Sequence, residues 1–107
     1  MRQHIRSTVG ILALLGAAIA ASAALADSKN FRLEPNLDRS GNDLRRDVLA
    51  ADADVEVCAA RCLGLAGCKS FTFVKKSTTV PAPICWLKDT TPVGYASSCC
   101  TSGVLKP

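Results

Sequence analysis

Six cysteines constrain the fold of this chain more than any other feature of its sequence. All of them lie within residues 58–100: Cys58, Cys62, Cys68, Cys85, Cys99 and Cys100. An even number of cysteines in a short exported chain indicates a disulfide framework. Small exported domains use such cross-links because their cores alone give only marginal stability. Whether disulfides form therefore depends on the compartment in which the chain folds.

The first 26 residues have the pattern of a secretory signal peptide. Arg2 and Arg6 give a basic start, residues 9–25 carry no charge, and Ala24-Leu25-Ala26 offers a cleavage site. A single membrane anchor is the alternative, because about 17 apolar residues is the lower limit of a spanning helix. The Ala-rich run and its Ala-x-Ala end favour cleavage. We therefore expect an extracytoplasmic protein, periplasmic or secreted, with no membrane insertion after cleavage.

Residues 27–107 are enough for one domain, with its core expected over about 30–105. Without Arg2 and Arg6, 11 of the 13 basic residues remain against 9 acidic residues, a net charge of +2. This charge is too small to indicate nucleic-acid binding. The single histidine, His4, lies in the leader, which excludes Ser-His-Asp and Cys-His nucleophile systems from the mature domain.

A helix is predicted over about 53–64. One helical face collects the apolar residues Val55, Cys58, Ala59, Cys62 and Leu65. Asp52 is placed to cap the first turn, and Gly64 or Gly67 can end the helix. The acidic residues near the helix start are interpreted as caps and dipole partners and not as catalytic groups.

The other predicted elements are extended. Residues 68–74 alternate with Phe71 and Phe73 on one side, and residues 84–88 form a second strand beyond the proline-containing loop 75–83. Further extended segments are expected near Phe31 and over 44–49 and 99–105, with turns over 34–42. Trp86 is expected in the core with the two phenylalanines. The fold class is α+β, one helix packed on a small antiparallel sheet.

No metal and no cofactor are expected. Zinc ligation by the cysteines is disfavoured by export to an oxidising compartment and by the lack of histidine and of a Cys-x-x-Cys knuckle. The same missing motif argues against a thiol-redox enzyme.

Three segments together resemble the PAN/apple domain family: CAARC at 58–62, CKSFTFV at 68–74 and CWLK at 85–88. Residues 36–44 and 99–104 resemble the ends of the compact bacterial branch of PAN-like domains, so the resemblance spans about residues 30–105. In that family a helix bearing Cys-x-x-x-Cys is joined by disulfides to the central strands.

The resemblance implies the pairs Cys58–Cys85 and Cys62–Cys68 out of 15 possible pairings. Apple domains usually join their two termini by a disulfide as well, but no cysteine precedes Cys58 here. Cys99 and Cys100 remain, and a vicinal bridge between them is favoured. The alternatives are that one of them competes for Cys58 or Cys62, or bonds another chain.

The resemblance also implies a non-catalytic binding module for protein–protein or protein–carbohydrate contacts. Candidate ligand contacts are five basic side chains and one tyrosine: Arg39, Arg45, Arg46, Lys75, Lys76 and Tyr95. Brought together, the basic ones would form a patch suited to an anionic glycan or an acidic protein surface; an ordinary solvated surface is the alternative. Two other functions stay open: a structural envelope-associated protein bridged through Cys99 or Cys100, and an inhibitor or subunit of an exported enzyme.

Overall fold

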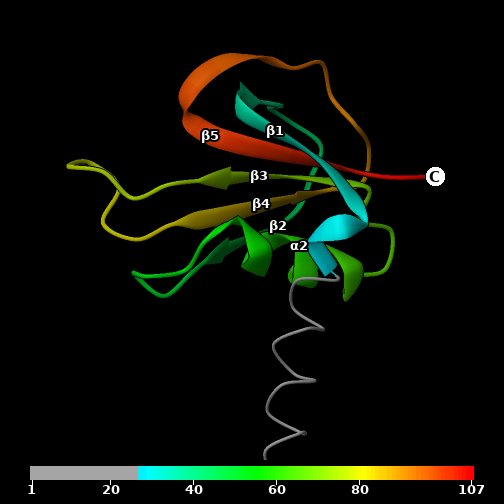
Figure 1. The fold of residues 1–107 in the computed structure, drawn as a ribbon, viewed down its shortest axis with the longest axis horizontal. Helices are drawn as coiled ribbons and strands as arrows, with labels where there is room; N and C mark the ends of the chain where they lie inside the picture. The colour runs from blue at the N-terminus through cyan, green and yellow to red at the C-terminus, as the bar shows by residue number, and fades with distance from the viewer. Residues whose placement is uncertain (1–26) are drawn as a thin grey trace, which may run out of the picture.

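The computed structural model describes residues 27–107; the predicted signal peptide lies outside the described residues. The elements are β1 (Phe31–Asp38), β2 (Asp43–Val48), α2 (Val55–Leu63), β3 (Ser70–Val74), β4 (Ile84–Lys88) and β5 (Tyr95–Leu105). The five strands form one antiparallel sheet in the order β1-β5-β3-β4-β2, and α2 packs on one face of its centre (Figure 1). The predicted α+β class, one main helix on an antiparallel sheet, is confirmed.

The core lies between α2 and the first face of the sheet. Phe71 on β3 is fully buried, and its ring meets that of Phe31 edge to face with centroids 5.1 Å apart. Gly103 on β5 is paired with Phe71, and a Cβ added there would lie 2.3 Å from the Phe71 ring. A residue without a side chain is therefore required at position 103.

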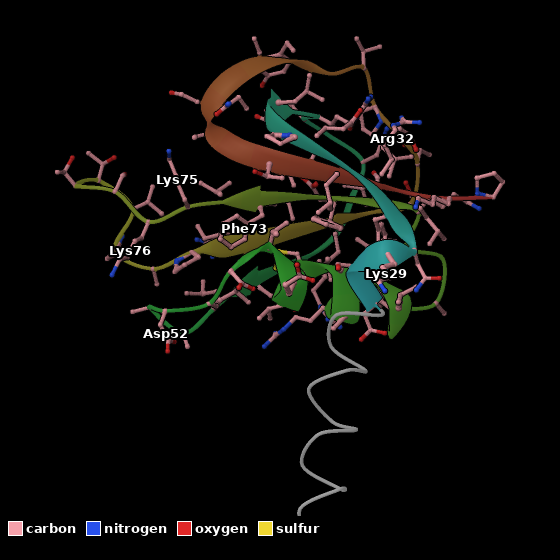
Figure 2. The ribbon with its side chains drawn as sticks, viewed as in Figure 1. Lys29, Arg32, Asp52, Phe73, Lys75 and Lys76 are labelled. Atoms are coloured by element: carbon pink, nitrogen blue, oxygen red, sulfur yellow. A yellow bond between two sulfur atoms is a disulfide. The ribbon has the colours of Figure 1, made fainter. Side chains whose placement is uncertain are left out.

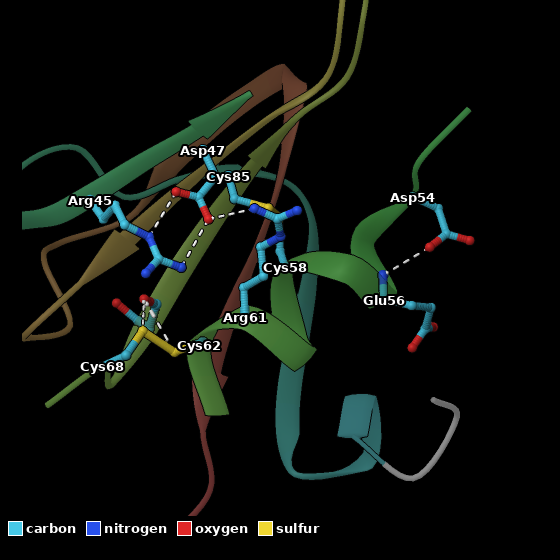
Figure 3. The surroundings of a disulfide bond; sticks show 10 residues. Arg45, Asp47, Asp54, Glu56, Cys58, Arg61, Cys62, Cys68 and Cys85 are labelled. Carbon is cyan, nitrogen blue, oxygen red and sulfur yellow. Dashed lines mark hydrogen bonds and ion pairs between the residues drawn. A yellow bond between two sulfur atoms is a disulfide. The ribbon is translucent and has the colours of Figure 1, made fainter. Parts of the chain in front are cut away.

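Two disulfides fix α2 to the rest of the domain (Figure 3). Cys58–Cys85 joins the helix to β4, and Cys62–Cys68 joins its last turn to the segment that enters β3. The Cα atoms lie 5.5 and 5.3 Å apart, within the usual range for disulfides. These are the pairings that the resemblance implies. Cys99 and Cys100, both in β5, bond each other, so no cysteine of the described residues is free.

The helix begins slightly later than expected. It starts at Val55, and the capping side chain is that of Asp54, which accepts a hydrogen bond from the Glu56 backbone N–H at 3.1 Å (Figure 3). The expectation that Asp52 caps the helix is wrong. An aspartate directly before the first helical residue can reach the second backbone N–H, whereas Asp52 lies too far upstream.

The strands β1 and β5 are longer than the sequence indicates. β1 runs through Pro35 and Asn36, which were expected in a turn, and β5 begins at Tyr95 instead of near residue 99. Asn36 has a φ of 58° and lies where the register of β1 with β5 shifts. Because β1 is an edge strand and carries this irregularity, it tolerates a proline and a left-handed asparagine.

Trp86 is not part of the core around Phe71, which corrects the expectation. It pairs with Thr72, the neighbour of Phe71 in β3, and side chains alternate between the two faces of a sheet. Trp86 therefore lies on the second face, opposite the helix, where it is only half-buried.

Candidate functional site

The second face of the sheet is covered by polar contacts. Its four buried polar side chains are Ser70, Thr72, Lys88 and Ser102. Hydroxyl groups bind this face to the segments that cross it: Ser102 Oγ donates to the Leu37 carbonyl at 2.9 Å, and Ser70 Oγ donates to the Thr90 carbonyl at 2.6 Å. The end of β1 and the loop after β4 are thus held in place without a second helix.

Arg39 is the main connection among these crossing segments. Its Nε and Nη2 donate to the two carboxylate oxygens of Glu34 at 2.8 and 2.9 Å, and its Nη1 donates to the Pro92 carbonyl at 2.6 Å. The hydrogen bonds from Arg39 hold the pKa of Glu34 below its usual value, against the opposing effect of burial. With these bonds made and only 15% of its side chain exposed, Arg39 positions the β1 end and is not a free ligand contact.

A cavity of about 260 Å³ opens on the same face. It is lined by Asp38, Ser40, Gly41, Asp43, Val74, Trp86 and Lys88. The residues come from β1, the turn after it, β2, β3 and β4, so the pocket exists only in the folded sheet. We refer to this cavity as the second-face pocket.

Lys88 lies in the wall of the second-face pocket with only 2% of its surface exposed. Its Nζ donates to Asp43 Oδ1 at 2.6 Å and to the Gly41 carbonyl at 3.2 Å. The ammonium charge is therefore balanced by Asp43, which is 32% exposed.

Asp38 is the second carboxylate of the pocket, and its hydrogen-bond partners are hydroxyl groups. Tyr95 OH donates to Asp38 Oδ2 at 3.0 Å, and Ser40 Oγ donates to the same oxygen at 3.3 Å. Ser40 Oγ and Tyr95 OH also lie 2.6 Å apart. Within residues 27–107, no lysine or arginine forms an ion pair with Asp38.

The side chains expected from the sequence to bind a ligand are divided between different parts of the fold. Tyr95 is connected to the second-face pocket by its hydrogen bond to the pocket residue Asp38. Arg46 lies beside the pocket, with the guanidinium carbon of Arg46 5.6 Å from the centroid of the Trp86 ring. Lys75 and Lys76 directly follow the end of β3, in the exposed loop of the β3–β4 hairpin (Figure 2).

Arg45 lies on the first face of the sheet. It donates to Asp47 at 2.7 and 2.9 Å, and Arg61 from α2 donates to the same carboxylate at 2.8 Å (Figure 3). Burial alone would raise the pKa of Asp47, but the hydrogen bonds of the two arginines outweigh it and hold the pKa below its usual value. The five basic residues therefore do not share one face: Arg45 and Arg46 lie on opposite faces of β2, and Lys75 and Lys76 lie in the loop after β3.

The pocket residues Asp38, Trp86 and Lys88 were missed as site residues. Two of them could be placed from the sequence, because alternate residues of a strand share a face. Trp86 and Lys88 in strand 84–88 must therefore lie on the face opposite to that of Cys85 and Leu87. Nothing local in the sequence indicates that the turn after β1 folds over that face and adds Asp38 and Asp43.

No group of three histidine, cysteine, aspartate or glutamate side chains in residues 27–107 is arranged to hold a metal ion. That part of the chain also contains no helix both long and apolar enough to cross a bilayer.

A helix joined by disulfides to the central strands of an antiparallel sheet, with a polar pocket on the other face, defines a small cross-linked α+β module. Residues 37–88 match the family model of the PAN domain, and this match supports a domain of the PAN/apple type. The match runs from the end of β1 to the end of β4 and includes both helix cysteines and their two partners. No curated protein and no solved structure matches the chain. PAN domains are in general protein- or carbohydrate-binding modules and are typically non-catalytic.

Proposed function

We propose that this protein is an extracytoplasmic, non-catalytic binding module that recognises a protein or carbohydrate ligand through the second-face pocket. The observation that carries the proposal is the pocket itself: charged and aromatic side chains converge in one concavity on a frame held by disulfides. Ligand sites commonly combine apolar walls with a few placed polar groups in this way. The disulfides and the predicted signal peptide support the extracytoplasmic location.

Two carboxylates outside the second-face pocket serve to connect elements of the fold. Glu34 and Asp47 are held ionised by neighbouring arginines that lower the pKa of each. A general acid that works at neutral pH needs a raised pKa instead. The Glu34 carboxylate binds Arg39 after β1, and the Asp47 carboxylate of β2 binds Arg61 of α2, so both stabilise the fold.

Of the side chains expected from the sequence, Arg46 and Tyr95 are the ones we assign to the ligand site. Both border the second-face pocket, through Trp86 and Asp38 respectively. Lys75 and Lys76 are available for a second contact with a large partner, because loops on a rigid scaffold often carry recognition. Arg39 and Arg45 act through their ion pairs.

The test uses the full chain expressed for export and purified in its oxidised form. It is applied to a glycan array and to immobilised extracellular protein extracts, together with the variants Trp86→Ala and Trp86→Phe. We expect binding to one ligand class, strong loss with Trp86→Ala and partial retention with Trp86→Phe. The variant Lys106→Ala changes an exposed side chain outside the pocket lining and serves as the control, which should bind as the unaltered protein does.

Binding that survives Trp86→Ala in a protein with an unchanged thermal transition would show that the pocket is not the recognition site. In the structure Cys99 and Cys100 bond each other within one chain. A covalent dimer on a non-reducing gel would mean that one of them bonds another chain instead, and would favour the structural alternative.

A further inference from the structure

We propose that the second-face pocket binds a primary ammonium group attached to a small apolar or cyclic body, with Asp38 as its counter-charge. A lysine side chain of a partner protein and an amino sugar both present this chemistry. The proposal rests on the proposed function, because it specifies what the same pocket recognises.

The charges of the pocket lining leave one carboxylate without compensation. Three ionisable side chains line the cavity: Asp38, Asp43 and Lys88. Lys88 is paired with Asp43 at 2.6 Å, whereas the hydrogen bonds that the Asp38 carboxylate accepts within residues 27–107 come from the hydroxyls of Tyr95 and Ser40. The residues that line the cavity therefore carry a formal charge of −1, and the positive Arg46 lies at the border of the cavity on the Trp86 side. A negative charge at one end of a concave site with low-dielectric walls attracts a cation to that end.

The hydrogen-bonding capacity of the pocket points to the same ligand. The protein uses Oδ2 of Asp38 and Oδ1 of Asp43, and the other oxygen of each carboxylate accepts no hydrogen bond from any residue of the described chain. An ammonium group has three donors and no acceptor. Hydrogen bonds between charged partners of this kind are about twice as strong as neutral ones.

The size and walls of the cavity limit the body that carries the ammonium. About 260 Å³ is below the roughly 300–1,000 Å³ of pockets that hold drug-sized ligands, so it suits one side chain or one sugar ring. Trp86 and Val74 supply apolar contact for methylene groups or ring carbons. Arg46, 5.6 Å from the Trp86 ring centroid, adds positive charge on that side. The ammonium is therefore placed at Asp38 and the apolar body at Trp86.

Trp86 provides the measurement, because it is the single tryptophan of the chain. The oxidised full chain is titrated at pH 7 with n-butylamine and with glucosamine, and its fluorescence is followed. Butanol and N-acetylglucosamine are the matched neutral probes. We expect saturable changes with both amines, with dissociation constants on the order of 1–10 mM, and none with the neutral probes. A response to only one amine identifies which source of ammonium the pocket accepts.

The variant Asp38→Asn tests the assigned counter-charge, because it removes the charge and keeps an acceptor for Tyr95 and Ser40. We expect the amine affinity to fall at least about tenfold. The control Asp89→Asn changes an exposed carboxylate outside the pocket lining and should leave the affinity unchanged. If Asp38→Asn does not fold, the salt dependence of the unaltered protein decides, since salt weakens an ion pair and not an apolar contact.

Equal affinity for the amines and the neutral probes, or no loss in folded Asp38→Asn, would overturn the ammonium proposal. So would an absence of any amine response. If Trp86-dependent binding to the array or extracts persisted in these cases, the proposed function would stand without it. Binding to the array or extracts that does not depend on Trp86 would instead overturn the proposed function of the pocket.

Discussion

Lys88 places a charged group almost completely inside the domain, on the face of the sheet that carries the pocket. Such a charge is tolerated because Asp43 and the Gly41 carbonyl both accept from its Nζ. The same contacts fix the turn after β1 to the end of β4. Lys88 therefore both lines the pocket and fixes the turn after β1.

Asp43→Asn should destabilise the protein by roughly 2–3 kcal/mol, because it leaves a buried ammonium without its counter-charge. The double variant Asp43→Asn/Lys88→Met should recover most of that loss, since it also removes the buried charge. Urea denaturation at pH 7 measures both. Equal destabilisation by the single and double variants would contradict the assigned role of the pair.

Gly103→Ala should destabilise the core by about 1–3 kcal/mol, because its Cβ would meet the buried Phe71 ring at 2.3 Å. Gly64→Ala is the matched control. Its Cβ would lie 3.5 Å from the nearest atom, and its backbone is in the right-handed helical region, so it should change stability by less than about 0.5 kcal/mol. Denaturation midpoints compare the two, and similar losses would argue against the tight contact between β5 and Phe71.

At the scale of elements, the end of β1 is held by the ion pair of Glu34 with Arg39 and by the contact of Arg39 with the loop after β4. This pair depends on the charge of Glu34. Because the folded-state pKa of Glu34 is lowered, its contribution is fully present above the unfolded pKa of about 4.5 and is lost as the pH falls through the folded value.

Glu34→Gln should therefore cost about 1–2 kcal/mol at pH 7, and the difference from the unaltered protein should shrink as the pH falls below the unfolded pKa of about 4.5. Chemical denaturation at a series of pH values measures this. Arg32→Gln is the control, because Arg32 is 63% exposed and approaches Glu34 only to 3.6 Å. A pH-independent difference would exclude an ionic contribution from Glu34.

The elements that the sequence predicts well are those with local signals. The period of the apolar residues indicates α2, and the alternation around Phe71 together with the prolines of the following loop indicates the β3–β4 hairpin. The pairing of β1 with β5 joins residues such as Phe31 and Leu105, and no local pattern encodes it. The pocket depends on that pairing and on the turn folded over the second face, so its residues could not be assembled from the sequence.

At the scale of the whole molecule, the disulfides contribute unequally. Cys58–Cys85 closes a loop of 27 residues, and Cys62–Cys68 one of 6. In the chain-entropy view these are worth about 3.5 and about 2 kcal/mol. A small domain has a total stability of roughly 5 kcal/mol, so loss of the longer loop removes most of it.

Cys58→Ser/Cys85→Ser should therefore lower the thermal transition far more than Cys99→Ser/Cys100→Ser, whose bridge joins neighbours and closes no loop. Reductant should abolish the cooperative transition of the unaltered protein. Calorimetry with and without reductant tests this, and a transition that reductant leaves in place would contradict the role of the cross-links.

The first and last strands of the domain are neighbours, with Phe31 opposite Leu105, and no disulfide joins them. A pulling force applied to the two ends would act on a single pair of residues at a time and would peel β1 from β5 progressively from that end. Mechanical resistance of this domain should therefore be low until the force reaches Cys58, where the covalent links to the centre of the sheet begin.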